Sequence, residues 1–136
     1  MSTYLISELA KKTALSTDTI RFYEKKGLIQ PNFRASNRYR YYAEDALKRL
    51  LFIKRCRALD MSLKEIEALI KLEQNPQQEC SAVNQLIDRH LEDISRKIKE
   101  LQLFQQQLST LRQSCNIPTT IDHCQILKTL EQTETH

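Results

Sequence analysis

One stretch of the sequence decides the fold: Ser16-Thr17-Asp18-Thr19-Ile20-Arg21-Phe22-Tyr23-Glu24-Lys25-Lys26-Gly27-Leu28-Ile29. Ser16 suits the N-cap of a helix, because its hydroxyl can accept a hydrogen bond from the first helical turn. Ile20 is the expected inward anchor of that helix. Gly27 is the single glycine of the chain and stands where a left-handed residue ends a helix. The stretch therefore predicts a helix over residues 17–26.

A shorter apolar pattern precedes this helix. Leu5, Ile6, Leu9 and Ala10 lie on one face at helical spacing, and Thr13-Ala14-Leu15-Ser16 then interrupts the pattern. Two short helices joined by such a turn form a helix-turn-helix. A purely structural pair of antiparallel helices gives the same pattern, so the pattern alone leaves both interpretations open.

Arginines alternate with aromatic residues in the segment 32–42 that follows. These arginines are Arg34, Arg38 and Arg40. The composition predicts a small two-stranded wing that exposes guanidinium groups, which match phosphate geometry through two parallel hydrogen bonds. The alternative is a solubilising loop in which Tyr41 and Tyr42 only pack on the core.

Two more helices are expected after the wing. Residues 44–59 place leucine and isoleucine inward and lysine and arginine outward. Ser62-Leu63-Lys64-Glu65 is a capping-box sequence that opens the next helix, and Asn75-Pro76 should end it. Cys56 has apolar neighbours in the first of these helices, and we expect it to be a core residue.

The strongest periodic signal lies between residues 80 and 111. Ile87, Ile94, Leu101 and Leu108 are separated by seven residues each time. This is the spacing of a coiled-coil seam, and the remaining surface of the helix is polar. Such a stripe requires a partner helix. A loop over residues 114–121 and a short amphipathic segment from Cys124 to Leu130 complete the chain.

Composition and charge limit the class of protein. A chain of 136 residues with one glycine and no tryptophan does not suit β-rich folds or glycine-lined phosphate loops, so helices must carry the fold. No apolar run approaches the roughly 18 residues of a membrane span, and the cytosol is the expected compartment. Residues 1–60 hold 13 Lys/Arg against 6 Asp/Glu, whereas residues 61–136 hold 8 against 11. The basic half suits a polyanion, although basic helical faces are often only solvated.

Four motifs together resemble one known family. They are Ile6-Ser7-Glu8-Leu9-Ala10, the opening stretch from Ser16 to Ile29, Asn37-Arg38-Tyr39-Arg40-Tyr41-Tyr42, and Leu59-Asp60-Met61-Ser62-Leu63-Lys64-Glu65-Ile66. They are similar to the MerR family of transcriptional regulators, and the resemblance covers nearly the whole chain. The run Thr-Ile-Arg-Phe-Tyr-Glu followed by Gly-Leu-Ile is far more specific than a generic helix-turn-helix.

The resemblance implies an all-α dominated fold with three parts. Residues 1–74 are expected to form a winged helix-turn-helix DNA-binding domain with linking helices. Residues 80–112 are expected to form a long antiparallel coiled-coil dimerisation helix, and residues 113–136 a metal-binding loop with a short C-terminal helix. Two departures stand out: Ala14 replaces a frequent glycine, for which we expect a slightly different turn geometry, and Arg38 adds a charge at the wing tip.

The resemblance also implies a mode of action. A cytoplasmic homodimer would bind a palindromic operator in promoter double-stranded DNA, repress without metal, and kink and untwist the DNA for RNA polymerase when metal binds. Its targets would be metal-resistance or efflux genes. The expected DNA-binding residues are Thr17, Thr19, Arg21 and Tyr23 on the recognition helix, Asn37, Arg38, Tyr39 and Arg40 in the wing, and Lys54 and Arg57 on the third helix.

The cysteines indicate how metal would bind. A helix over residues 81–112 is roughly 48 Å long at its usual rise, so Cys80 and Cys115 of one chain cannot share an ion. In an antiparallel dimer, Cys80 meets Cys115 and Cys124 of the partner chain, which gives two sites per dimer. Three thiolates suit a soft divalent ion such as Cd(II), Pb(II) or Hg(II), and less distinctively Zn(II). Three unrelated thiols are the alternative.

Sequence similarity favours one branch of the family. The copper-responsive branch lacks a cysteine at the start of the long helix, and the zinc-responsive branch has adjacent cysteines and a loop histidine. The stretches 83–91, 107–112 and 124–130 look most similar to the cadmium- and lead-responsive regulators, so we expect Cd(II) or Pb(II) as effector. His123 or Asp122 could supply a fourth ligand.

Three alternatives stay open at this point. The effector of a regulator of the same family could be Hg(II) or Zn(II). A cytosolic metal-storage or trafficking protein would explain the cysteines but not the basic winged segment. A thiol enzyme would need a base beside its nucleophile, and no cysteine–histidine arrangement with an orienting partner is evident, so we expect no enzyme.

Overall fold

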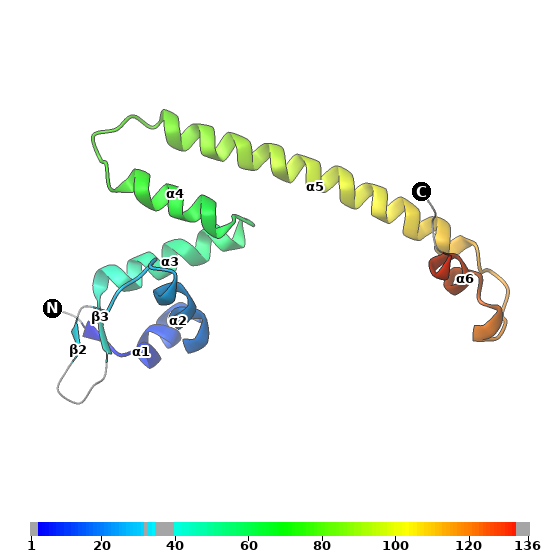
Figure 1. The fold of residues 1–136 in the computed structure, drawn as a ribbon, viewed down its shortest axis with the longest axis horizontal. Helices are drawn as coiled ribbons and strands as arrows, with labels where there is room; N and C mark the ends of the chain where they lie inside the picture. The colour runs from blue at the N-terminus through cyan, green and yellow to red at the C-terminus, as the bar shows by residue number, and fades with distance from the viewer. Residues whose placement is uncertain (1–2, 32, 35–39, 133–136) are drawn as a thin grey trace. The chain divides into compact units, whose positions relative to one another are not determined.

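The computed structural model describes residues 3–31, 33–34 and 40–132. The chain is mostly helical, which confirms the fold class expected from the sequence. It divides into two compact units, Met1–Asn84 and Gln85–His136, with the boundary inside the long helix. The three-part division made from the sequence stays a prediction. Figure 1 identifies the elements of each unit.

The N-terminal unit opens with two short helices, α1 (Ile6–Thr13) and α2 (Thr17–Lys25). Ser16 is the N-cap of α2, and its Oγ accepts a hydrogen bond from the backbone N–H of Thr19 at 3.0 Å. After α2, Gly27 adopts a φ of 80°, which only glycine takes without strain. The predicted helix and its N-cap are confirmed, and α2 ends at Lys25, one residue before the expected position.

The turn between these helices corrects one expectation. Ala14 has φ 58° and ψ 31°, the left-handed conformation that a glycine adopts readily. The turn therefore keeps a geometry that suits glycine instead of shifting to fit the alanine. A left-handed alanine places its Cβ too close to the following carbonyl oxygen, at a cost of about 1–2 kcal/mol.

Replacing Ala14 with glycine is expected to raise the free energy of unfolding by about 1 kcal/mol, because the relief of left-handed strain exceeds the extra entropy of an unfolded glycine. Urea denaturation followed by circular dichroism measures the change. Ala10→Gly, inside α1, is the matched control and should lower the free energy of unfolding by about 0.5–1 kcal/mol. Destabilisation by both substitutions would show that Ala14 is not strained.

A small antiparallel sheet accompanies the helices. It consists of β1 (Thr3–Tyr4), β2 (Phe33–Arg34) and β3 (Arg40–Ala43) in the order β1-β3-β2. The strands β2 and β3 form the expected wing pair, with Phe33 opposite Tyr41. Residues 35–39 between them lie outside the described part. The strand β1 was not predicted, because two residues are too short to show an alternating pattern.

The helices α3 (Glu44–Ala58) and α4 (Leu63–Glu73) complete the core of this unit. The predicted capping box of α4 is present: Ser62 N donates to Glu65 Oε1 at 2.9 Å and Glu65 N donates to Ser62 Oγ at 3.1 Å. Side chains that are fully buried include Leu9, Ile20, Tyr42, Leu50, Ile53 and Ile66. Cys56 is also buried, as expected, and Tyr42 packs in the core.

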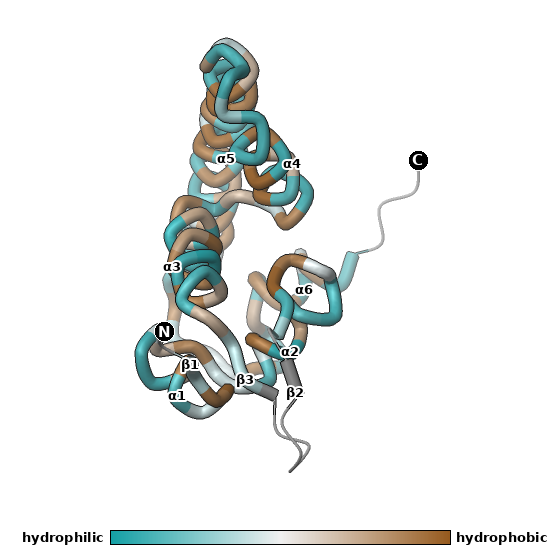
Figure 2. Tube along the Cα trace, turned by 90° about the vertical axis from the view of Figure 1, so that its left-hand side faces the viewer, coloured by the Kyte–Doolittle hydropathy of each residue, from teal (hydrophilic) through white to brown (hydrophobic). Residues whose placement is uncertain are grey.

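The long helix α5 (Ser81–Gln113) has 33 residues and is followed by a 3₁₀ turn, Ile121–His123, and the short helix α6 (Gln125–Glu131). Figure 2 shows apolar and polar residues distributed around α5. The predicted seam residues Leu101 and Leu108 are 62% and 64% exposed in the single chain. None of the helices in the described part of the chain combines the length and apolar character needed to cross a membrane.

Candidate functional site

The first candidate surface is the exposed side of α2. Thr17 and Thr19 are half-buried, whereas Arg21 is exposed. Arg21 Nη1 lies 3.5 Å from Asp18 Oδ1, and the arginine side chain is 59% exposed. An exposed ion pair of this kind contributes little stability, so Arg21 can exchange this partner for an external one at small cost.

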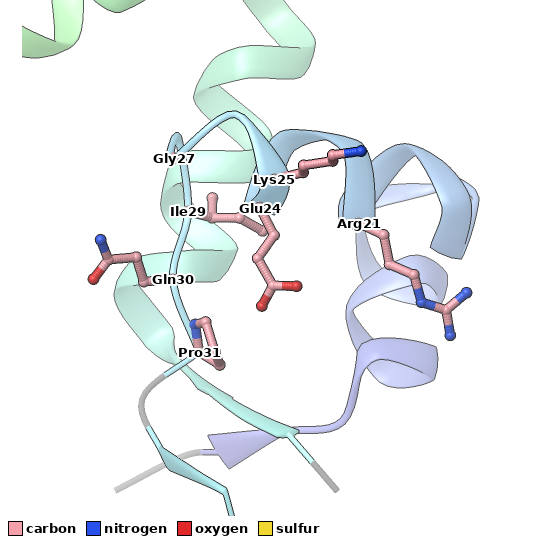
Figure 3. A pocket seen from close by; sticks show the side chains of 7 residues that line it. All are labelled: Arg21, Glu24, Lys25, Gly27, Ile29, Gln30 and Pro31. Atoms are coloured by element: carbon pink, nitrogen blue, oxygen red, sulfur yellow. The ribbon is translucent and has the colours of Figure 1, made fainter.

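A cavity of about 490 Å³ lies beside this helix, between α2 and the segment from Gly27 to Pro31. Figure 3 shows the carboxylate of Glu24 directed into this space, with Arg21 on the α2 side and Pro31 opposite. Tyr42 Oη donates a hydrogen bond to Glu24 Oε1 at 3.0 Å. Glu24 therefore ties α2 to β3.

Tyr23 lies on the opposite face of α2. Only 7% of this residue is exposed, and its ring belongs to the core, with the ring of Phe22 5.8 Å away between centroids. A DNA contact by Tyr23 stays a prediction that this burial does not favour. The sequence already indicated that Tyr23 is buried, because it lies three residues after the inward anchor Ile20 and therefore on the same face of α2.

The two expected contacts from α3 bind the protein's own backbone. Lys54 Nζ donates to the carbonyl of Thr13 at 2.6 Å. Arg57 Nη1 donates to the carbonyl of Met61 at 2.9 Å, just before α4. A cation is favoured at the carbonyl of Thr13 because Thr13 ends α1 and the last carbonyls of a helix lack intrahelical partners. The carbonyl of Met61 lies in the turn between α3 and α4. Both side chains thus have structural partners in the described residues.

The wing carries the remaining DNA-contact predictions. Arg40 is the first residue of β3. Asn37, Arg38 and Tyr39 lie outside the described residues. The structure describes the wing strands β2 and β3, and the DNA contacts expected from the wing stay predictions.

The second candidate site lies in the C-terminal unit, where the loop after α5 brings two cysteines together. Cys115 and Cys124 are both half-buried free thiols. The pKa of Cys124 is lowered, chiefly by the backbone N–H of Leu127, against an opposing effect of partial burial, and further by the N–H of Ile126 and by the thiol of Cys115. Cys124 precedes α6 directly, and a helix N-terminus stabilises a thiolate. The arrangement suits two thiolate ligands.

A polar cluster precedes Cys124 in the same loop. His123 Nδ1 lies 3.2 Å from both Asp122 Oδ1 and Thr120 Oγ1. Thr120 and then His123 lower the pKa of Asp122 through hydrogen bonds. A cavity of about 440 Å³ is lined by Cys115 and His123 among others. The ring of His123 is thus held through Nδ1, as in histidines that bind metal through the other nitrogen.

The remaining two cysteines differ in their surroundings. Cys80 is exposed and immediately precedes α5, whereas Cys115 follows α5 by two residues. Because α5 is one helix of 33 residues, about 50 Å long, one ion cannot bind both thiols within a chain. Cys56 is buried in α3, and this burial raises the pKa of its thiol, which makes it a poor ligand.

Comparison with known proteins agrees with these features. The chain matches the family description "MerR HTH family regulatory protein" over residues 4–73 and "MerR, DNA binding" over residues 47–111. It is 41% identical over 108 residues to the HTH-type transcriptional regulator ZntR homolog of Haemophilus influenzae, covering 79% of this chain and 80% of the relative. It is 42% identical over 110 residues to a probable heavy metal-dependent transcriptional regulator of the same organism, covering 81% and 86%.

A solved structure extends the similarity to the full fold. The transcription regulator PbrR691 from Ralstonia metallidurans CH34, in complex with lead(II), shares 43% identity and a TM-score of 0.78, covering 92% of this chain and 97% of that one. The helix-turn-helix with its capped α2, the wing strands and the long α5 are the features that these matches span. The chain belongs to the MerR family of DNA-binding transcriptional regulators, which are not enzymes.

Proposed function

We propose that this protein is a transcriptional regulator that responds to Cd(II) or Pb(II). It acts as a homodimer on a palindromic operator, in the cytoplasm, and activates metal-resistance or efflux genes together with RNA polymerase. The observation that carries this proposal is the pair formed by Cys115 and Cys124 beyond the C-terminal end of α5, with Cys80 at the other end.

Dimerisation completes each metal site. The exposed apolar residues of α5 need a partner, and a second α5 running antiparallel places the start of one helix beside the end of the other. Cys80 of one protomer then joins Cys115 and Cys124 of its partner. Each dimer holds two such sites because a two-fold interface repeats every contact.

The ligand set supports a soft divalent ion. Three thiolates form a net-anionic, polarisable site, which favours Cd(II), Pb(II) and Hg(II) over harder ions. The 43% identity to the regulator solved with lead(II) supports Pb(II), and the same three soft thiolates also suit Cd(II). His123, held through Nδ1 beside Cys124, is the candidate for a fourth ligand, which Cd(II) would use more readily than Pb(II).

Metal and DNA act on the same equilibrium in this proposal. Metal favours one geometry of the dimer, and that geometry favours bent, untwisted DNA, so the two ligands are coupled through the relative position of the protomers. We expect operator affinity to be similar with and without metal, because the regulator distorts bound DNA instead of leaving it.

The test is transcription from a reconstituted promoter, titrated separately with Cd(II), Pb(II), Hg(II) and Zn(II), with operator occupancy followed by footprinting. Activation by Cd(II) or Pb(II) at the lowest concentrations, with constant occupancy, supports the proposal. Activation by Hg(II) or Zn(II) at lower concentrations would assign another effector. Absence of salt-dependent DNA binding would favour a metal-storage or trafficking protein.

The proposed DNA contacts are Thr17, Thr19 and Arg21 of α2 together with wing residues Asn37, Arg38, Tyr39 and Arg40. Arg21→Ala is expected to weaken operator binding by about 1–3 kcal/mol, the value of a charged hydrogen bond to a base or phosphate. Fluorescence anisotropy with a labelled duplex measures the change. Arg96→Ala, which removes the same charge from α5, is the control. Equal affinities of the two variants would assign Arg21 to the solvated surface.

A further inference from the structure

Two basic side chains of α3 bind the backbone on either side of the recognition helix α2. Lys54 Nζ donates to the carbonyl of Thr13 at 2.6 Å. Arg49 Nη1 donates to the carbonyl of Leu28 at 3.4 Å. Thr13 is the last residue of α1, before the turn into α2, and Leu28 follows the end of α2. The helix α3 therefore holds the chain both before and after α2.

The contact before α2 is embedded in a hydrogen-bonded turn. Thr13 is 1% exposed, its Oγ1 donates to the carbonyl of Leu9 at 2.7 Å, and the same oxygen accepts from the N–H of Leu15 at 3.3 Å. Ala14 between them is left-handed. The carbonyl of Thr13 ends α1 without an intrahelical partner, and the helix dipole favours a cation there. The ammonium of Lys54 supplies both a hydrogen-bond donor for this carbonyl and a positive charge at the end of the α1 dipole.

The contact after α2 fixes a buried segment. Leu28 and Ile29 are 6% and 4% exposed, and Leu28 N donates to the carbonyl of Tyr23 at 3.0 Å. The guanidinium of Arg49 donates a hydrogen bond to the carbonyl of Leu28. Arg49 and Lys54, five residues apart along α3, thus bind the backbone on both sides of α2.

We propose that Lys54 and Arg49 are positioning residues, which hold α2 at the orientation in which its side chains read bases. They act through the backbone of the helix-turn-helix and need no contact with DNA. The inference rests on the proposed DNA-binding function. Base contacts carry specificity and require placement within about 0.5 Å, whereas phosphate contacts supply affinity and register but read no bases. A residue that positions α2 therefore affects specificity above all.

A phosphate-binding Lys54, as expected from the sequence alone, would behave differently. Its loss would weaken specific and non-specific binding in parallel and reduce the slope of log K against log salt by about 1. Loss of a positioning residue lowers affinity for the specific site, while non-specific affinity and the salt slope stay the same. The two roles can therefore be separated in one set of titrations.

The DNA arm uses a duplex that the unmodified homodimer selects from random sequence, beside a scrambled duplex of equal length. Lys54→Met and Arg49→Met should each reduce affinity for the selected duplex about three- to tenfold, with the scrambled duplex unaffected. Lys54→Arg should restore the affinity, because a guanidinium can donate to the same carbonyl. Lys48→Met, which removes an exposed charge from the same helix, is the matched control and should preserve the ratio of the two affinities.

A second arm needs no DNA. Hydrogen exchange by mass spectrometry on the free dimer should show faster exchange of residues 15–29 in Lys54→Met and Arg49→Met, with α4 and α5 unchanged and Lys48→Met like the unmodified protein. Hydrogen exchange tests the positioning role of Lys54 and Arg49 even if the unmodified protein selects no DNA sequence. Failure to select a sequence would contradict the proposed function but not the positioning role. If Lys54→Met does not fold, Arg49→Met supplies the expected loss in both arms, and Lys54→Arg supplies the expected retention. Unchanged exchange of residues 15–29, or parallel loss of both affinities with a smaller salt slope, overturns the inference.

Discussion

Replacing Leu101 and Leu108 with glutamate is expected to convert the homodimer into a monomer and to abolish operator binding. The two leucines are 62% and 64% exposed in the single chain, and they lie on the seven-residue repeat that the partner helix must cover. Burying one leucine contributes about 1.5–3 kcal/mol, and the symmetric dimer contains each of them twice. Four buried carboxylates would add desolvation costs, so we expect the dissociation constant to rise more than about 1000-fold.

Analytical ultracentrifugation of both proteins at micromolar concentration measures this effect. Gln102→Glu with Gln106→Glu is the matched control, because it adds the same charges to exposed positions of α5 away from the repeat. The control should remain dimeric. Circular dichroism and the melting temperature should show that the N-terminal unit keeps its fold. A dimer that survives both glutamates would place the interface on another surface and would remove the geometric basis of the interchain metal site.

The helices were predictable because their ends carry local signals. Ser16 and Ser62 cap α2 and α4 through contacts that span three residues, and such contacts depend little on the rest of the fold. The seven-residue repeat of α5 is equally local. The strand β1 and the turn at Ala14 were not predictable, since pairing with β3 and the orientation of α1 depend on distant residues.

In the candidate sites too, features that depend on nearby residues were predictable and features that depend on distant residues were not. The length and antiparallel pairing of the long helix assigned Cys115 and Cys124 to one site, and in the structure the Cys115 thiol hydrogen-bonds to Cys124. The chemistry of Lys54 could not be read in the same way. A lysine on a basic helix suggests phosphate, and only the fold reveals the carbonyl of Thr13, 41 residues earlier in the chain, as its partner.

A second large effect is expected in the metal affinity of a mixed dimer. One protomer carries Cys80→Ser, and the other carries Cys115→Ser with Cys124→Ser. One of the two interchain sites then loses all three thiols. The other keeps Cys80 of one protomer together with Cys115 and Cys124 of its partner. Each parent homodimer lacks at least one thiol in both sites.

The mixed dimer should therefore bind one Cd(II) or Pb(II) per dimer with an intact thiolate-to-metal charge-transfer band. Its affinity should exceed that of either homodimer more than about 100-fold, since loss of a direct ligand costs at least as much as loss of a group that only supports one. Differently tagged chains, refolded together and purified by both tags, provide the mixed species for titration with each ion. Cys56→Ser is the control for removal of a thiol, and it should leave two sites per dimer because Cys56 is buried in α3.

Two outcomes of this titration distinguish the interchain site from its alternatives. If the mixed dimer binds no better than the Cys80→Ser homodimer, Cys80 is not a ligand, and Cys115 and Cys124 hold the ion with groups of their own loop, of which His123 is the nearest candidate. If the Cys80→Ser homodimer alone binds two ions tightly, the interchain arrangement is wrong as well. Only recovery of a single tight site requires ligands from both chains, because the 33 residues of α5 keep Cys80 and Cys115 of one protomer apart.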